Sequence, residues 1–579
     1  MPIAALRRVG VAGLLGLLAG ALVLMLTPGN PGALRLAGIG LSWWYAAVVA
    51  PLAAVLLVVV VQRAAPGPAS RRSMALAVAA WTSPVLLGLV AARGFAGGSD
   101  APALALAVLV APLVAFLVPA SSGGRRPDVV TAVTISAAAG CIVWANLLLV
   151  ADVAGLLGLP RWAATALATL IALVALELAR ATDAARGAPG RERGAGTASR
   201  LYRAALRGGG LTLLYASAAG FVALVVVIAL TLVTSPWGAW RALASRPALT
   251  FSELSPWVTE GRTLTRATEL DFTEAHRVTA LSPATYRVLE PGRFREWPLR
   301  AGESIALRAG DRLVVDAGAR LRFEAGKRIP GSPASGVAWA DPPERAGVPA
   351  AAEVLGVMVT LVGGALAFVG SRPTPGARTV HVGSVLLLAL VLASLSLGVF
   401  GAFAAPGLSI GVSALAAVFD LPAAIVPGPR GRALGGLGVL VLLVLFAATA
   451  LALRDVLRRA MREPDRDASA PERARPIMRV FLIAAWIGSL WGGEASRALL
   501  TGLGLAASAT LASRLVDEQP GARLVAPLVG VITFAAVSIL GARLPAWASA
   551  VGAYPVLAAL PLAWAALLAW NVVAPRRAV

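Results

Sequence analysis

Long apolar runs separated by short polar connections make up most of this 579-residue chain. A helix needs roughly 20 residues to cross the hydrocarbon core of a bilayer. The runs predicted to span before a polar segment at 236–349 are 9–26, 41–61, 74–92, 101–120, 129–151, 162–179 and 211–233, and those after it are 354–370, 382–403, 433–453, 480–493, 498–513, 524–540 and 548–573. The pattern predicts an all-α polytopic integral membrane protein with about 14 transmembrane helices, seven in each half.

The polar segment contains a different periodicity, an eight-residue repeat that begins with Ala-Gly. The three copies read AGESIALR from Ala301, AGDRLVVD from Ala309 and AGARLRFE from Ala317. Apolar and polar residues alternate inside each copy, as they do in half-buried strands joined by tight turns that contain glycine. The sequence therefore predicts three parts: an N-terminal membrane domain (1–235), a small inserted β-rich domain (236–349) and a C-terminal membrane domain (350–579).

Composition supports lipid as the solvent for much of the surface. Hydrophobic residues form 58% of the chain and charged residues 14%, whereas soluble domains carry about 25% charged residues. The net charge is +22, and Lys327 is the only lysine, so arginine supplies nearly all of the positive charge. These arginines lie in short connections between apolar runs, which is the pattern of a topology signal and not of a nucleic-acid surface. We expect no nucleic-acid partner.

The arginine distribution also predicts an orientation. Arg7 and Arg8, Arg71 and Arg72, Arg125 and Arg126, and the stretch 180–207 fall in every second connection. Because cytoplasmic loops are enriched in Lys and Arg, both termini should be cytoplasmic and residues 236–349 should lie outside. Scarce lysine with abundant alanine, glycine and arginine is typical of a GC-rich bacterium, so the predicted location is a bacterial cytoplasmic (inner) membrane.

One apolar segment, 405–427, is predicted not to cross. If it crossed, the basic stretch 454–479 would face outward, against the charge rule. Pro406, Pro422 and Pro427 would also interrupt a spanning helix. We therefore interpret this segment as re-entrant or interfacial.

The predicted substrate-binding residues lie in the second half of the chain. The segment from Trp486 to Arg497 reads WIGSLWGGEASR, and the two runs beside it are short and interrupted by glycine. Short, broken membrane segments are the best sequence indicator of a binding site in transporters. The substrate-binding residues predicted from this argument and from the non-crossing segment are Trp486, Trp491, Glu494, Arg497 and Asp420. A simpler interpretation is an aromatic belt with a Glu494–Arg497 pair.

Other polar residues predict no catalytic or metal site. Glu177 is expected to pair with Arg180 at a helix end, and Glu353 begins a helix at the outer side. Cys141 is the single cysteine, which excludes an internal disulfide. The two histidines, His276 and His381, have no partner at metal-ligand spacing. No cofactor is expected.

Three functions are compatible with this organisation. The first is transport or translocation of a lipid-linked or other amphipathic envelope substrate. The second is a non-catalytic membrane subunit whose domain at 236–349 docks an extracytoplasmic protein partner. The third, a membrane-embedded transferase, ranks last because no acid/base pair is recognisable. In each case the bilayer itself is a partner.

Overall fold

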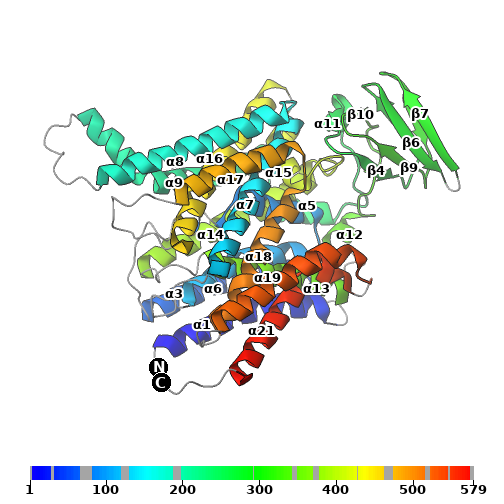
Figure 1. The fold of residues 1–579 in the computed structure, drawn as a ribbon. Helices are drawn as coiled ribbons and strands as arrows, with labels where there is room; N and C mark the ends of the chain where they lie inside the picture. Colours follow the sequence, from blue (N-terminus) through cyan, green and yellow to red (C-terminus); the bar gives the residue numbers. More distant parts are fainter. Residues whose placement is uncertain are drawn as a thin grey trace, which may run out of the picture.

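The computed structural model has a large helical body with two four-stranded β-sheets at one end of it (Figure 1), and a short two-stranded sheet of β1 (Arg35–Leu36) and β2 (Ile39–Gly40). It describes residues 3–27, 31–64, 78, 81–118, 129–186, 197–253, 255–290, 293–341, 348–368, 377–426, 428–461, 474–515, 522–545 and 548–573. Much of the predicted arginine signal, including Arg71, Arg72, Arg125 and Arg126, lies outside these ranges, as do residues 187–196, 462–473 and 574–579.

Eight helical segments in the described ranges are long and apolar enough to cross a membrane. They belong to α1 (Ile3–Leu26), α2 (Leu41–Trp44) continued by η2 (Tyr45–Val49) and α3 (Ala50–Ala64), α6 (Asp100–Leu117), α7 (Val129–Leu156), α8 (Arg161–Arg186), α9 (Thr197–Leu232), α14 (Ala377–Ala404) and α16 (Pro429–Ala460). The chain therefore has the architecture of a multi-pass membrane protein.

The remaining predicted runs also fall, at least in part, on helices. These are α5 (Pro84–Ala96), α13 (Val348–Phe368), α17 (Ala474–Leu490), α18 (Ala495–Leu515), α19 (Ala522–Leu540) and α21 (Val556–Val573). The total of 14 spans stays a prediction, because several of these helices are short.

Helix α6 lies at the centre of the body. Its residues from Ala101 to Leu117 are all buried, and it contacts α1, α3, α5, α13 and α14. The outer helices expose large apolar side chains instead, such as Leu56, Leu170 and Ile532. In water such a surface would be unfavourable, but lipid tails solvate it.

Two predicted helices are interrupted by Ser-Pro and Tyr-Pro pairs. The run 74–92 is not continuous, because the Oγ of Ser83 accepts a hydrogen bond from the backbone N–H of Leu86 and caps a new helix that starts at Pro84. The run 548–573 contains short α20 (Ser549–Ala553), and the last helix begins only at Val556. In both places proline occupies a position where a helix starts easily and continues poorly.

The segment predicted not to cross contains one short helix, α15 (Ala414–Ile425). At 1.5 Å per residue its 12 residues are about 18 Å long, well under the roughly 30 Å hydrocarbon thickness. Residues 415–422 are buried, and the re-entrant or interfacial placement of the segment stays a prediction. Pro427 lies outside the described residues.

The inserted domain is a two-layer sandwich. Its strands are β3 (Arg262–Thr263), β4 (Thr268–Asp271), β5 (His276–Ala280), β6 (Ala284–Glu290), β7 (Arg293–Leu299), β8 (Ser304–Leu307), β9 (Arg312–Val315) and β10 (Arg320–Arg322). One sheet has the order β3-β10-β5-β8 and the other β4-β9-β6-β7, with every pairing antiparallel.

The eight-residue repeat supplies β8, β9 and β10 to alternate sheets. The apolar residues of each copy, such as Leu307, Leu313 and Leu321, are buried between the layers, as the alternation predicted. Gly302, Gly310 and Gly318 have φ of +92°, +91° and +92°, in the left-handed region that glycine adopts without steric cost. Each Ala-Gly turn therefore carries the chain from one sheet to the other and does not close a hairpin.

The sandwich is fixed to the helical body by specific contacts. Trp257 Nε1 donates to the carbonyl of Gly407 at 2.7 Å, and the backbone amides of Thr265 and Arg266 donate to the carbonyl of Gly411 at 2.9 and 3.1 Å. Two charged contacts accompany them. Arg266 pairs with Asp152 of α7 at 2.8 Å, and Arg262 pairs with Asp420 of α15.

A cluster of three buried tryptophans joins the body to the two short helices on either side of the sandwich in the sequence, α10 (Pro236–Ala244) and α12 (Gly336–Ala340). Trp43, Trp240 and Trp339 have ring centroids 5.8–6.2 Å apart. The Nε1 of Trp339 also donates to the carbonyl of Phe95 at the end of α5. These contacts, together with those of Gly407 and Gly411, hold the sandwich at several points.

Candidate functional site

A pocket lies between the two halves of the helical body, where α5 ends and α6 begins. It has a volume of about 80 Å³, which is room for roughly six water-sized groups. Its apolar wall comes from α1, α5, α6, α13 and α18, through Met25, Leu89, Leu104, Met358 and Leu500. The pocket therefore joins helices from both ends of the sequence.

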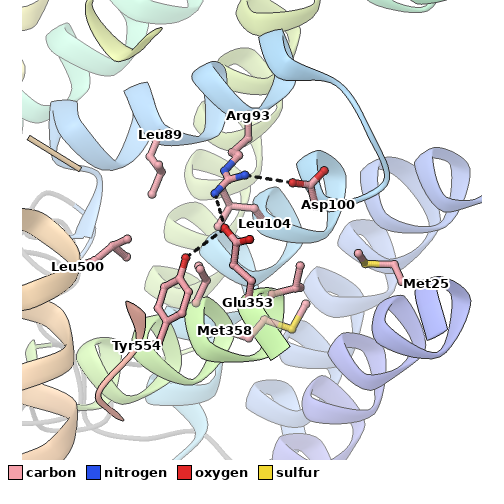
Figure 2. A pocket seen from close by; sticks show the side chains of 11 residues that line it. Met25, Leu89, Arg93, Asp100, Leu104, Glu353, Met358, Leu500 and Tyr554 are labelled. Atoms are coloured by element: carbon pink, nitrogen blue, oxygen red, sulfur yellow. Dashed lines mark hydrogen bonds and ion pairs between the residues drawn. The ribbon is translucent and has the colours of Figure 1, made fainter. Parts of the chain in front are cut away.

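Four polar side chains converge on the same pocket (Figure 2). Arg93 donates from Nη1 to Asp100 at 3.2 Å and from Nη2 to Glu353 at 3.0 Å. The hydroxyl of Tyr554 donates to the same oxygen of Glu353, Oε1, at 3.4 Å. The arginine thus bridges two carboxylates from different halves of the chain.

Local sequence explains where Arg93 and Asp100 lie. Arg93 is in the last turn of α5, and Gly97 follows as the C-cap. Asp100 is in the first turn of α6, where the helix dipole stabilises a negative charge. The short Gly-Gly-Ser connection reverses the chain, so the two side chains meet across it.

Close packing between α5 and α14 fixes the position of Arg93 in the helical body. A Cβ added at Gly398 of α14 would overlap the carbonyl oxygen of Ala91, and one added at Gly94 would lie 2.9 Å from the carbonyl oxygen of Leu395. The two backbones therefore touch directly beside Arg93. Any side chain at Gly398 would push α5 away and carry Arg93 with it.

Glu353 and Tyr554 are held in place by a second close contact. Glu353 lies in α13, and Tyr554 lies between α20 and α21. The ring of Tyr554 packs over Gly356, one turn after Glu353, where an added Cβ would lie 2.5 Å from Cγ of the tyrosine. This contact brings the phenol to the carboxylate of Glu353.

The formal charge of the cluster is negative. Asp100 and Glu353 contribute two negative charges, Arg93 contributes one positive charge, and a tyrosine is neutral near pH 7. The side chains of Arg93 and Glu353 are 32% and 48% exposed, respectively, so a ligand can reach them. The arrangement suits a small polar group attached to an apolar tail. Among the described residues no group of three His, Cys, Asp or Glu side chains could hold a metal ion.

The residues predicted from sequence are not in this cluster, although some of them lie close to a helix that lines the pocket. Trp486 lies in α17, and Trp491, Glu494 and Arg497 lie in or beside the turn that leads into α18. Leu500, three residues after Arg497, lines the pocket. The segment 486–497 thus leads into α18, whose Leu500 lines the pocket, but none of residues 486–497 lines the pocket.

The expected Glu494–Arg497 pair is absent from the ion pairs of the described residues. Glu494 instead accepts a hydrogen bond from the Oγ of Ser496 at 2.6 Å. The physical reason is that α18 begins only at Ala495, so Glu494 precedes the regular turn in which residues three apart lie side by side. Trp491 is 83% exposed, as expected for an aromatic side chain facing the membrane interface.

Asp420 has a partner that the sequence did not reveal. It is buried in α15 and accepts a hydrogen bond from Arg262 of β3. No described contact joins it to Trp486, Trp491, Glu494 or Arg497. Its position assigns it to the junction between the sandwich and the helical body.

Glu177 has a partner on another helix that was not predicted from the sequence. Its carboxylate accepts a hydrogen bond from Arg479 of α17 and lies 3.8 Å from Arg475, so it links α8 to α17. The side chain of its expected partner, Arg180, lies outside the described residues. The pair is therefore tertiary, joining helices some 300 residues apart in sequence.

Arg93, Asp100 and Tyr554 were not predicted as site residues from the sequence. Arg93 counted only as a charge in an outer connection, and Glu353 only as the start of a helix. A usable signal was present, because Arg93 and Asp100 flank a Gly-Gly turn between two apolar runs.

No known protein family and no characterised protein matches this sequence. The argument about function therefore depends on the geometry of the pocket.

Proposed function

We propose that this membrane protein binds an amphipathic envelope substrate in the pocket around Arg93 and Glu353, and moves it across or out of the bilayer. The observation that carries the proposal is the pocket itself. It combines a charged cluster with a wall of leucine and methionine side chains, and it lies between the two halves of the chain. Substrate sites of many transporters lie at such an interface between two halves.

The location of the pocket is compatible with release at the outer side. Glu353 follows the inserted domain closely in sequence, and Trp339 contacts the end of α5, so the pocket lies at the same end of the body as the sandwich. The amino end of α1 and the carboxyl end of α21 lie away from the sheets (Figure 1). The orientation inferred from arginine requires the termini and residues 236–349 to lie on opposite sides, and this arrangement is compatible with that requirement.

A reconstitution experiment tests the proposal. Proteoliposomes would carry phospholipids with a fluorescent tail label, and translocation would be followed by chemical quenching of the outer leaflet. Leu104→Trp places an indole in the pocket wall and should abolish translocation. Ile532→Trp, on a lipid-exposed surface of α19, is the matched control and should leave the rate unchanged. Equal rates in both variants would remove the pocket from the mechanism.

A second candidate function is a scaffold for an extracytoplasmic protein partner. It is favoured by the sandwich projecting from the helical body (Figure 1), which leaves much of its surface uncovered by the rest of the chain. Cross-linking of the full-length protein in native membranes tests this function. A stoichiometric partner attached through the sandwich, with no translocation in liposomes, would favour the scaffold.

A further inference from the structure

One oxygen of the Glu353 carboxylate is left available in the pocket. Both hydrogen bonds to this side chain, from Arg93 and from Tyr554, reach Oε1. Among the described residues Oε2 has no hydrogen-bond donor. The side chain is 48% exposed and lines the pocket (Figure 2). A carboxylate oxygen accepts only, so a ligand that binds here must donate.

The charge balance specifies the donor further. Arg93 is shared between two carboxylates, so the described cluster keeps a net charge of −1. A negatively charged ligand group would have to displace one carboxylate from the guanidinium. A positively charged group instead compensates the excess charge and forms a charge-assisted hydrogen bond, which is the stronger class.

The pocket walls specify what the donor is attached to. Met25 and Met358 lie on one side of the cluster and Leu500 on another (Figure 2). Methionine is flexible and polarisable and adapts to irregular apolar partners. These residues suit an alkyl chain, while the cavity of about 80 Å³ suits a compact headgroup.

We propose that the pocket binds the ammonium headgroup of an amine-bearing membrane lipid, with Glu353 Oε2 as the acceptor. This inference rests on the proposed function and names the substrate class of the same pocket. Asp100, held at the start of α6, keeps Arg93 from neutralising Glu353 fully.

Lipid titration of the purified full-length protein, followed by native mass spectrometry, tests the proposal. The probes are phosphatidylethanolamine, phosphatidylglycerol with the same acyl chains, and free ethanolamine. We expect the ethanolamine lipid to bind at least about tenfold more tightly than the glycerol lipid. Glu353→Gln should remove that preference. Glu296→Gln is the matched control, because Glu296 is an exposed carboxylate on the sandwich and does not line the pocket, and it should keep the preference.

Two results would overturn the proposal. One is equal or tighter binding of the glycerol lipid by the unaltered protein, a comparison that requires no variant to fold. The other is tight binding of free ethanolamine that the lipid does not displace, which would assign the site to a soluble amine. If translocation is blocked by Leu104→Trp but no headgroup preference exists, the proposed function stands and this inference fails.

Discussion

The buried pair between Arg262 and Asp420 should control whether the sandwich stays docked. The side chains are 14% and 4% exposed, respectively, and Nη1 of Arg262 has no hydrogen-bond partner among the residues that the structure describes. Asp420→Asn removes the compensating charge and leaves the guanidinium buried. Breaking a buried ion pair costs about 3–5 kcal/mol. We expect a destabilisation at the lower end of this range, about 3 kcal/mol, because Arg262 keeps some contact with solvent.

That free energy corresponds to a roughly hundredfold increase in the population of locally opened molecules. Hydrogen exchange at β3 and the residues just after it should accelerate by about the same factor. The fluorescence of Trp257, which is buried against Gly407, should shift to the red as the junction opens. Both assays use the full-length protein in detergent or nanodiscs.

A control variant on the same sandwich separates the effect of breaking a buried ion pair from the effect of removing any negative charge. Glu296→Gln removes an exposed partner of Arg287, 3.6 Å away, and a surface pair is worth within about 1 kcal/mol. The double variant Arg262→Gln with Asp420→Asn should cost less than the sum of the single changes. Exchange in Asp420→Asn no faster than in Glu296→Gln would refute the reasoning.

Three further predictions follow from the same structure. Gly398→Ala should destabilise the protein by about 1–3 kcal/mol through overpacking. Gly436→Ala is the control and should have little effect, because nothing lies within 4 Å of a Cβ added there. Equal thermal unfolding temperatures for the two variants would contradict this prediction. Burial lowers the pKa of His276, so the unfolded state binds more protons than the folded state below about pH 6.5. The stability of the sandwich should therefore fall on acidification. His276→Gln should weaken this pH dependence, measured by hydrogen exchange across a pH series. Arg308→Cys in a Cys141→Ser background should react with an impermeant thiol reagent added outside intact cells, and labelling only after lysis would invert the topology.

The local patterns of the chain predicted most of its helices and the strands of the repeat, but not the breaks inside 74–92 and 548–573. Period-two alternation identified the strands of the eight-residue repeat, because side chains in a strand alternate between two faces. The partners of those strands could not be predicted. β10 pairs with β3 and β5, and such pairings depend on contacts between distant segments that no local pattern encodes.

The pocket was missed for a related reason. Arg93 and Glu353 are 260 residues apart, and Tyr554 lies 201 residues beyond Glu353. In the sequence each is a lone polar residue near a helix end, where a polar side chain can reach the membrane interface without a partner. Asp420 was selected because its segment is irregular, and it proved to be half of an ion pair whose other member is 158 residues away.

The most direct test of the account is a cryo-electron microscopy map of the full-length protein in nanodiscs that contain phosphatidylethanolamine. We predict lipid density with its headgroup beside Glu353 and its chain along Met25 and Met358, and no such density in the Leu104→Trp variant. An empty pocket in the unaltered protein, with ordered lipid at the turn around Trp491 instead, would contradict the account.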